Sequence, residues 1–481
     1  MIRFGAMLLR GISVAIIGAI LAGCTAAPPP ALPPVPPPAG GAGTVRAIAW
    51  SSDAELLQIA GGGEECRLER WDVREARRLS ADELPFCPSF LRRARDGRFV
   101  AGDGHRGIVL EGGAIRLTEG SILDASAEGD ELRLDDGALV RIGAGGARLP
   151  FPGRVRDARL LPGGSAMVLS SGPEGDSLVH WAPSGEGLVR AGPFRGIDSF
   201  DVSPDGLEMV FSALREESFD VGIASTDGGE PRWIGPDPLE ERMVSWAPRG
   251  NKVTYRIEGV AGAVLRTVHV PTGFQLGVAL PQSSVGALAW EPRAERFAVA
   301  VSSASSAGRV DVLRYGGEER RTVIPPSAVL DAEADHLPGV AGAVLFHPAR
   351  LRYGERVPVV VWVTGETAFE WSAPRAEVHQ NRNVATVVVS AKQAAAGALW
   401  DAIAELAWAD PSAIFAVVPP AAAGAAAGIP GRAGITVLTT RDAAGGGGSD
   451  VVRSSTDDLE SFAARWLESH LKETRPEHDR S

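Results

Sequence analysis

A repeated strand–turn–strand pattern constrains the fold of this 481-residue chain more than any other feature. Three copies are clear: FDVSPDGLEMVF at 200–211, VSWAPRGNKVTY at 244–255 and LAWEPRAERFAV at 288–299. Val202, Trp246 and Trp290 hold equivalent places, so successive copies lie 44 residues apart (246 − 202 and 290 − 246). Four weaker copies begin at positions 48, 90, 123 and 158, and the pattern therefore occurs seven times.

A period of this length with several short strands per unit is typical of β-propeller blades. The turns fit, because Pro fixes φ at the first corner and Asp-Gly or Gly-Asn tolerates positive φ. We therefore expect an all-β propeller of about seven blades over residues 45–327. The repeats resemble the WD40-like "SPDG" units of TolB-type and prolyl-oligopeptidase-type propellers, a resemblance that implies a fold and no particular function.

The pattern changes after about residue 328. Continuous apolar runs, typical of strands buried on both faces of a parallel sheet, alternate with segments of helical spacing. The expected strands are 357–363, 384–391, 413–418 and 434–440, and the expected helices are 399–409 and 456–471, the second with Thr456 as its N-cap. Such alternation predicts a small three-layer α/β domain over 328–475, followed by a short tail at 476–481.

A propeller followed by this domain resembles the prolyl oligopeptidase class of serine peptidases. VAGAVLFHP and VPVVVWVTGE, at 340–348 and 357–366, follow the outline of that family's opening strands, and Asp410–Ser412 matches its segment before the nucleophile strand. In the family that strand ends in G-x-S-x-G, a sharp turn that carries the catalytic serine. The resemblance thus implies an α/β-hydrolase-like domain.

The catalytic elements of that family are missing from this sequence. Residues 420–424 read PAAAG, so Ala422 stands at the degenerate nucleophile position, and alanine has no oxygen with which to attack. Residues 364–367 read TGET where the family has its oxyanion loop, and Ala391 and Lys392 replace an arginine-glycine pair. The segment between residue 440 and the final helix leaves little room for later strands that would carry an acid and a histidine. We expect a truncated domain without catalytic residues, a pseudo-peptidase.

The first 24 residues predict export to the cell envelope. Two arginines, a short apolar run and small residues before a cysteine form the pattern of a signal peptide. The sequence LAGC at 21–24 resembles the lipobox of bacterial lipoproteins, which implies that Cys24 carries the lipid. A Pro/Gly-rich linker at 25–44 follows. We therefore expect a protein that is lipid-anchored to a bacterial membrane, on its periplasmic or outer-membrane face.

Composition narrows the classes of partner. The net charge is −12 and both signs are mixed along the chain, so nucleic acid is not expected as a partner. Cys66 and Cys87 could form a disulfide outside the cytoplasm, although two buried thiols would also fit. Cysteine and histidine are not clustered as in a zinc site, and we expect no metal and no cofactor.

Three functions remain open at this level. The first is a non-catalytic envelope lipoprotein that binds a protein or peptide partner, or acts as a scaffold, through its propeller. The second is an active serine peptidase or esterase of the prolyl oligopeptidase class, with its nucleophile among Ser390, Ser412 and Ser449. The third is a propeller that binds sugars or peptides while the C-terminal domain serves only as its cap.

Overall fold

The computed structural model describes residues 44–419, 435–440, 451–454 and 459–473. Within the first of these ranges short gaps remain at 63–64, 112, 136–137, 144–147, 152–153, 217, 235–238, 260, 318, 349–350, 352–353, 365–367 and 370. Cys24, residues 25–43 of the linker, Ala422, Ser449 and Thr456 lie outside the described residues.

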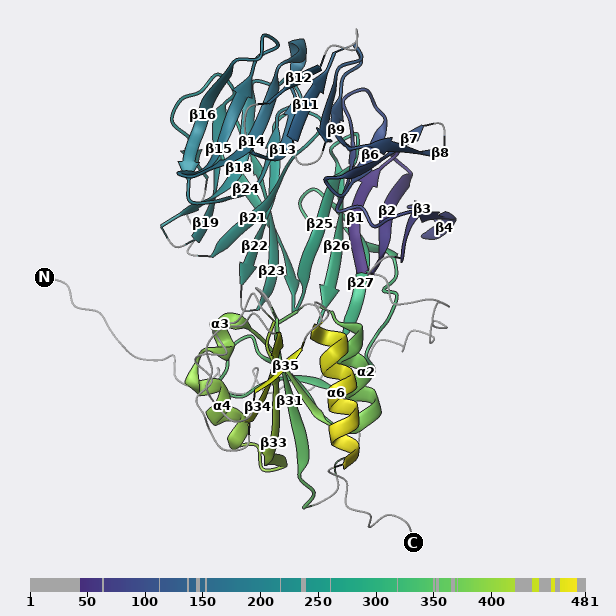
Figure 1. The fold of residues 1–481 in the computed structure, drawn as a ribbon, viewed down its shortest axis with the longest axis vertical. Coiled ribbons are helices and arrows are strands. Elements are labelled where there is room, and N and C mark those ends of the chain that lie inside the picture. The colour runs from purple at the N-terminus through teal and green to yellow at the C-terminus, as the bar shows by residue number, and fades with distance from the viewer. Residues whose placement is uncertain are drawn as a thin grey trace, which may run out of the picture. The chain divides into compact units, whose positions relative to one another are not determined.

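Seven four-stranded antiparallel sheets follow one another along the chain and form a propeller, which confirms the fold predicted from the repeats (Figure 1). Each blade is built from one continuous segment of sequence. Blades 1 to 3 are β1 (Thr44–Trp50), β2 (Glu55–Gly62), β3 (Glu65–Asp72), β4 (Arg77–Leu84); β5 (Phe90–Arg93), β6 (Phe99–Gly102), β7 (Arg106–Glu111), β8 (Ala114–Glu119); and β9 (Ser121–Ala125), β10 (Glu131–Asp135), β11 (Ala138–Ile142), β12 (Arg148–Pro150).

Blades 4 to 7 are built in the same way. They are β13 (Arg154–Leu160), β14 (Ala166–Gly172), β15 (Gly175–Trp181), β16 (Gly187–Phe194); β17 (Ile197–Val202), β18 (Glu208–Arg215), β19 (Ser218–Ser225), β20 (Arg232–Trp233); β21 (Glu240–Trp246), β22 (Lys252–Gly259), β23 (Gly262–His269), β24 (Phe274–Pro281); and β25 (Ser284–Trp290), β26 (Arg296–Ser303), β27 (Ser306–Arg314), β28 (Arg320–Ile324).

The repeated motif forms the first hairpin of each blade. Val202, Trp246 and Trp290 each pair with the residue seven positions later, at the closing end of that hairpin. In blade 5 the turn is held by Asp205, whose Oδ1 accepts hydrogen bonds from Ser203 Oγ at 2.6 Å and from Leu207 N at 3.0 Å. Gly206 has a φ of 75°, a conformation that glycine adopts without strain. The 44-residue spacing in the sequence is therefore the distance along the chain between the first hairpin turns of successive blades.

Side chains close the ring between blade 1 and blade 7, because no strand is exchanged between them. Trp50 Nε1 donates to the carbonyl oxygen of Ala289 at 3.0 Å, and Arg296 Nη2 donates to that of Asp53 at 2.8 Å. An apolar cluster drawn from both blades packs behind these bonds. Burial of that cluster is the main stabilising contribution at the junction.

A charged cluster links the first strands of blades 2 and 4. Asp157 accepts from Arg92 at 3.0 Å and from Arg159 at 2.8 Å. Burial opposes ionisation of Asp157, but the charges of Arg159 and Arg92 outweigh it and lower the pKa of the Asp157 carboxyl to about 2. The carboxylate is therefore charged throughout the physiological range, and it holds two arginines that would otherwise repel each other.

Cys66 on β3 and Cys87 in the segment between β4 and β5 are joined by a disulfide, with their Cα atoms 5.1 Å apart. Both residues lie in or against an apolar cluster that blades 1 and 2 share. The bond closes a loop with a sequence separation of 21, so it restricts the unfolded chain around this junction.

A seven-stranded mixed sheet follows the propeller in sequence, in the order β29-β30-β32-β31-β33-β34-β35. β29 and β30 are antiparallel to their neighbours, whereas the strands from β32 to β35 run parallel. Their bounds are β29 (Ala334–His336), β30 (Val344–Phe346), β31 (Val357–Thr364), β32 (Ala385–Ser390), β33 (Ala409–Val417), β34 (Ile435–Thr440) and β35 (Val451–Ser454).

Helices cover both faces of this sheet (Figure 1). α3 (Ala391–Ala394) and α4 (Gly397–Ala404) pack on one face, and α2 (Ala373–Arg382) and α6 (Leu459–Glu473) pack side by side on the other. The stripe of α6 that meets the sheet has helical spacing: Leu459, Ala463, Leu467 and Leu471. None of the described helices combines the length and apolarity needed to cross a bilayer.

Three local expectations for this domain were wrong. α4 ends at Ala404 and does not reach residue 409, because the chain turns there and Trp408 accepts a hydrogen bond from Val357 N at 2.9 Å. β33 begins at Ala409, so the segment 410–412 belongs to the strand, at an irregular point of its pairing with β31. β35 occupies a segment expected to be a loop, and it is a strand through its pairing with β34.

Candidate functional site

The carboxyl ends of the parallel strands β32, β31 and β33 mark the position where open α/β sheets bind ligands. Thr364 ends β31 and Ser390 ends β32, and the two residues are partners in the register of the strands. Val418 follows β33 and is fully buried, and its N–H donates to the carbonyl oxygen of Leu438 at 2.9 Å. Thr364 and Ser390 are the hydroxyl residues among these three positions, so their contacts decide what chemistry this edge could perform.

Both hydroxyls are hydrogen-bonded to backbone groups. Thr364 Oγ1 donates to the carbonyl oxygen of Val389 at 3.0 Å. Ser390 is the N-cap of α3: its Oγ accepts from Gln393 N at 3.4 Å, while Gln393 Oε1 accepts from Ser390 N at 2.7 Å. This reciprocal capping arrangement fixes the start of the helix and occupies the serine that sequence analysis considered as a nucleophile. Ser390 has no hydrogen bond to a histidine among the described residues.

Ser412, the second candidate serine, is exposed near the beginning of β33. Its Oγ donates to Asp410 Oδ1 at 2.6 Å, and its N–H donates to the same oxygen at 2.9 Å. This is an Asx turn, a local way of satisfying the backbone at an irregular strand start. A carboxylate alone at this position does not form the serine–histidine contact that acyl transfer requires.

His347 and Asp335 form a histidine–carboxylate pair that sequence analysis missed. His347 Nε2 lies 3.0 Å from Asp335 Oδ2, and the ring centroids of His347 and Trp408 are 5.9 Å apart. The pair arises from the β29–β30 hairpin, in which Asp335 is opposite Leu345, two residues before the histidine. The register of that hairpin would have predicted the contact. The Asp335 side chain is 64% exposed, and no serine or threonine hydroxyl in the described part of the chain bonds to His347.

His379 lies on α2 and is 2% exposed. Its Nδ1 is 3.0 Å from Thr386 Oγ1, and its ring packs edge-on against Phe346. Burial lowers the pKa of His379 to about 4, so the ring is neutral near pH 7. Thr386 is fully buried near the amino end of β32, away from the edge where a substrate would bind, and the contact therefore belongs to the core.

His470 lies 3.1 Å from Ser469 Oγ on α6. His470 Nδ1 also lies 3.0 Å from the carbonyl oxygen of Trp466, to which Ser469 Oγ donates at 2.8 Å. Because a carbonyl oxygen only accepts, Nδ1 carries the ring's proton and cannot remove one from the serine. The ring stacks on Trp466 with centroids 3.7 Å apart, and the arrangement stabilises the helix end.

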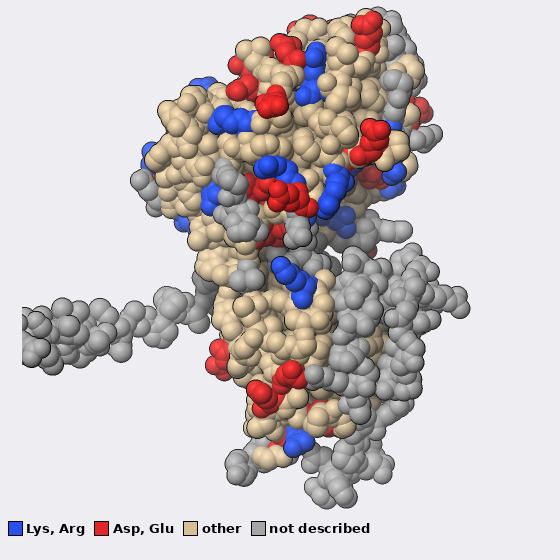
Figure 2. Space-filling model, turned by 90° about the vertical axis from the view of Figure 1, so that its left-hand side faces the viewer, with Lys and Arg blue, Asp and Glu red and all other residues tan. Residues whose placement is uncertain are grey.

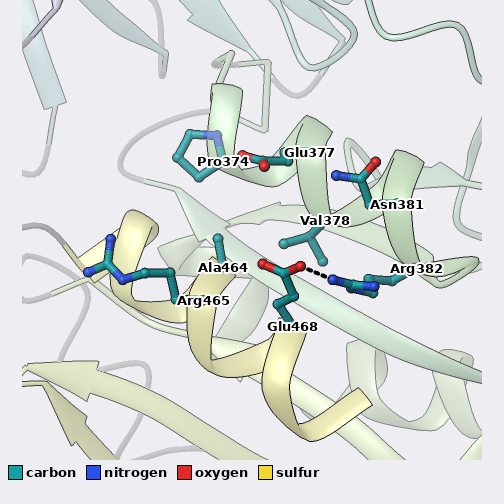
Figure 3. A pocket seen from close by; sticks show the side chains of 8 residues that line it. All are labelled: Pro374, Glu377, Val378, Asn381, Arg382, Ala464, Arg465 and Glu468. Atoms are coloured by element: carbon teal, nitrogen blue, oxygen red, sulfur yellow. Dashed lines mark hydrogen bonds and ion pairs between the residues drawn. The ribbon is translucent and has the colours of Figure 1, made fainter. Parts of the chain in front are cut away.

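A small hollow of about 130 Å³ lies between α2 and α6 (Figure 3). The ion pair of Arg382 with Glu468 bridges the two helices, and Glu377, Asn381 and Arg465 line the hollow beside it. None of its eight lining residues is a serine, threonine, cysteine or histidine. The hollow therefore has no group for acyl transfer.

Two other kinds of site, for a metal ion and for nucleic acid, were sought among the described residues. Within them, no group of three or more histidine, cysteine or carboxylate side chains is placed to hold a metal ion. On the face shown in Figure 2, basic and acidic side chains are interspersed and form no large patch of one sign. A basic stripe of the kind that binds phosphate backbones is thus not seen on that face.

No protein-family model and no curated protein matches this chain. Solved structures do share its fold. Pyrococcus horikoshii acylaminoacyl peptidase aligns with a TM-score of 0.61 at 12% identity, over 81% of this chain and 76% of that chain. Puromycin hydrolase aligns with a TM-score of 0.60 at 15% identity, over 90% of this chain and 83% of that chain.

A prolyl endopeptidase aligns with a TM-score of 0.58 at 10% identity, over 80% of this chain and 70% of that chain. At these identities the likeness is one of fold, and activity does not transfer with it. The chain therefore has the propeller architecture of prolyl oligopeptidase-type enzymes.

Proposed function

We propose that this chain is a membrane-anchored envelope lipoprotein, a non-catalytic relative of the prolyl oligopeptidase class that binds a protein or peptide partner through its propeller. The anchor would be lipid on Cys24, and residues 25–44 would be the spacer. The propeller would span residues 45–327, and a truncated hydrolase-like domain would span 328–475.

The connection from β33 to β34 is the observation that carries this proposal. It reads VPPAAAGAAAGIPGRAG over residues 418–434 and contains no serine, threonine, cysteine, histidine or acid. In α/β-hydrolases the nucleophile stands on the turn that follows such a strand. An error of several residues in placing Ala422 therefore does not supply a nucleophile, because the whole connection lacks one.

The geometry of the other candidates supports the same conclusion. Ser390 caps a helix, Ser412 closes an Asx turn, and Ser469 faces a histidine nitrogen that carries a proton. His347 makes no hydrogen bond to a serine or threonine hydroxyl within the described part of the chain. Catalysis of this type needs a nucleophile, a base and an acid in one place. The described residues do not form such a group.

A fluorophosphonate probe tests the non-catalytic role, because it reacts with activated serines and leaves unactivated ones unmodified. The full chain, purified in detergent, should remain unlabelled under conditions in which an active serine peptidase is labelled stoichiometrically. Stoichiometric labelling of a single residue, mapped by mass spectrometry and lost in the matching Ser→Ala variant, would overturn the proposal in favour of an active peptidase or esterase.

A further inference from the structure

A hollow with a volume of about 480 Å³ lies between blades 1 and 2 of the propeller. The two blades are adjacent, since β1 contacts β5, and they share one apolar cluster. A volume of this size is within the range of about 300–1,000 Å³ found for small-ligand sites. The proposed function does not specify which class of ligand the propeller binds. The residues that line this hollow indicate that class.

The floor of the hollow is apolar. Leu57 and Leu110 are 2% and 6% exposed and belong to the cluster that joins the blades, and Phe99 packs against that cluster. The Cys66–Cys87 disulfide lies in the same cluster and holds the two blades at this junction. The floor is therefore a fixed surface against which an apolar side chain can be buried.

Charged side chains line the hollow above this floor, and their pairing is unequal. Arg98 is neutralised, because it pairs with Asp96 and, at 3.1 Å, with Glu131. The side chains of Arg93 and Glu111 are exposed, and among the described residues neither side chain makes a hydrogen bond or an ion pair. The Arg93 guanidinium lies over the Phe99 ring, 5.9 Å from its centroid. One hollow thus presents a cation and an anion that do not neutralise each other.

A second guanidinium group reinforces the basic side. Arg70 reaches the hollow from blade 1 and forms a long ion pair with Glu55, at 3.8 Å, so most of the N–H donors of its guanidinium group remain available to a ligand. Gly97 and Gly113, with φ of 89° and 90°, form the turns beside Arg93 and Arg70. A Cβ at either glycine would stand 3.8 or 3.7 Å from the guanidinium nitrogen beside it, an ordinary contact distance, so each guanidinium group lies next to one of these turns.

We propose that this hollow binds a short peptide with free ends and an apolar side chain. Its carboxylate would be held by Arg93 and Arg70, since guanidinium groups bind carboxylates with paired hydrogen bonds. Its ammonium group would pair with Glu111, and its side chain would lie on the floor. A simple anion would leave Glu111 unpaired and repel it, which is why a zwitterion fits better. The inference rests on the proposed binding role and names the ligand class.

Calorimetric titration of the full chain in detergent with the dipeptide Leu-Phe tests this. We expect saturable binding with a Kd of about 0.1–1 mM, because the charged contacts are exposed and contribute little each. N-acetyl-Leu-Phe and Leu-Phe amide, which each lack one charge, should bind about fivefold to tenfold more weakly. Arg93→Gln and Glu111→Gln should each weaken Leu-Phe binding by a similar factor.

Arg116→Gln and Glu119→Gln on β8 are matched controls, because both residues are exposed on the same blade and neither lines the hollow. Circular dichroism should show all four variants folded. Absence of saturable Leu-Phe binding, equal binding of the capped dipeptides, or equal effects of the control substitutions would each overturn the inference. Fluorophosphonate labelling tests for an activated serine and does not depend on dipeptide binding. A negative result in the binding experiment therefore does not decide whether the chain is catalytic.

Discussion

Acid should destabilise the α/β domain through His379, and the size of the effect can be worked from the structure. The ring is 2% exposed, packs against Phe346 and has a pKa of about 4, against about 6.5 in the unfolded chain. Between these values the unfolded state binds the proton and the folded state does not. Stability is therefore full above pH 6.5 and falls as the pH decreases towards 4.

The expected loss attributable to this ring is about 2 kcal/mol at pH 5 and about 3 kcal/mol at pH 4. His379→Gln removes the titration and keeps an amide able to bond to Thr386. The variant should therefore lose about 3 kcal/mol less than the parent chain between pH 7 and pH 4. Comparing the two proteins cancels the contribution of the other titrating groups, provided that they do not interact with the ring.

Urea unfolding followed by circular dichroism at 222 nm measures this difference. Every α-helix that the structure describes lies in this domain, so the helical signal reports its unfolding. Asn381→Ala, an exposed change on the same helix, is the control and should keep the pH dependence of the parent. If parent and His379→Gln lost equal stability between pH 7 and pH 4, the buried, neutral state of His379 would be refuted.

Three further predictions concern the propeller and the anchor. Changing both Cys66 and Cys87 to serine should cost about 3 kcal/mol, from the loop of 21 residues that the disulfide closes, and non-reducing thermal melts with and without the substitution measure it. Asp157→Asn should cost about 3 kcal/mol, because it leaves two partly buried arginines facing each other, and urea unfolding followed by tryptophan fluorescence at pH 7 would detect it. The carboxylate's contribution should be complete above about pH 4 and be lost as the pH falls from there towards 2, so a loss already at pH 5 would contradict its lowered pKa. Cys24→Ala should move the chain from the membrane to the soluble fraction on centrifugation, and unchanged sedimentation with membranes would argue against lipid on Cys24 as the sole anchor.

The propeller could be predicted because each blade repeats one local structure. Trp246 and Trp290 close the same hairpin in successive blades, so a local turn and its flanking strands appear in the sequence at a constant period. The valine-rich strands β31 and β32 could also be found, since strands buried on both faces are continuous apolar runs.

Elements defined by distant partners could not be found in this way. β35 is four residues long, and only its pairing with β34 makes it a strand. α2 has a largely polar sequence, although Ser372 as its N-cap and Pro374 in its first turn are signals that could have located it. The His347–Asp335 contact depends on the register of a short hairpin, and the hollow between blades 1 and 2 depends on packing between sheets.

The candidate site in the α/β domain was reached mainly through a family resemblance. That resemblance indicated where a nucleophile should stand, and the residues there supplied the chemical argument against one. The structure adds the environment of the remaining hydroxyls, notably Ser390 and Ser412, which sequence alone could not exclude because catalytic groups are brought together by the fold.

Turnover by the purified full chain tests the central claim most directly. p-Nitrophenyl acetate and a set of N-blocked and free aminoacyl 4-nitroanilides should be hydrolysed no faster by the protein than by an equal concentration of its Ser390→Ala, Ser412→Ala double variant. Rates proportional to protein concentration, saturable in substrate and abolished by replacing one hydroxyl residue would contradict the account and identify the chain as a hydrolase.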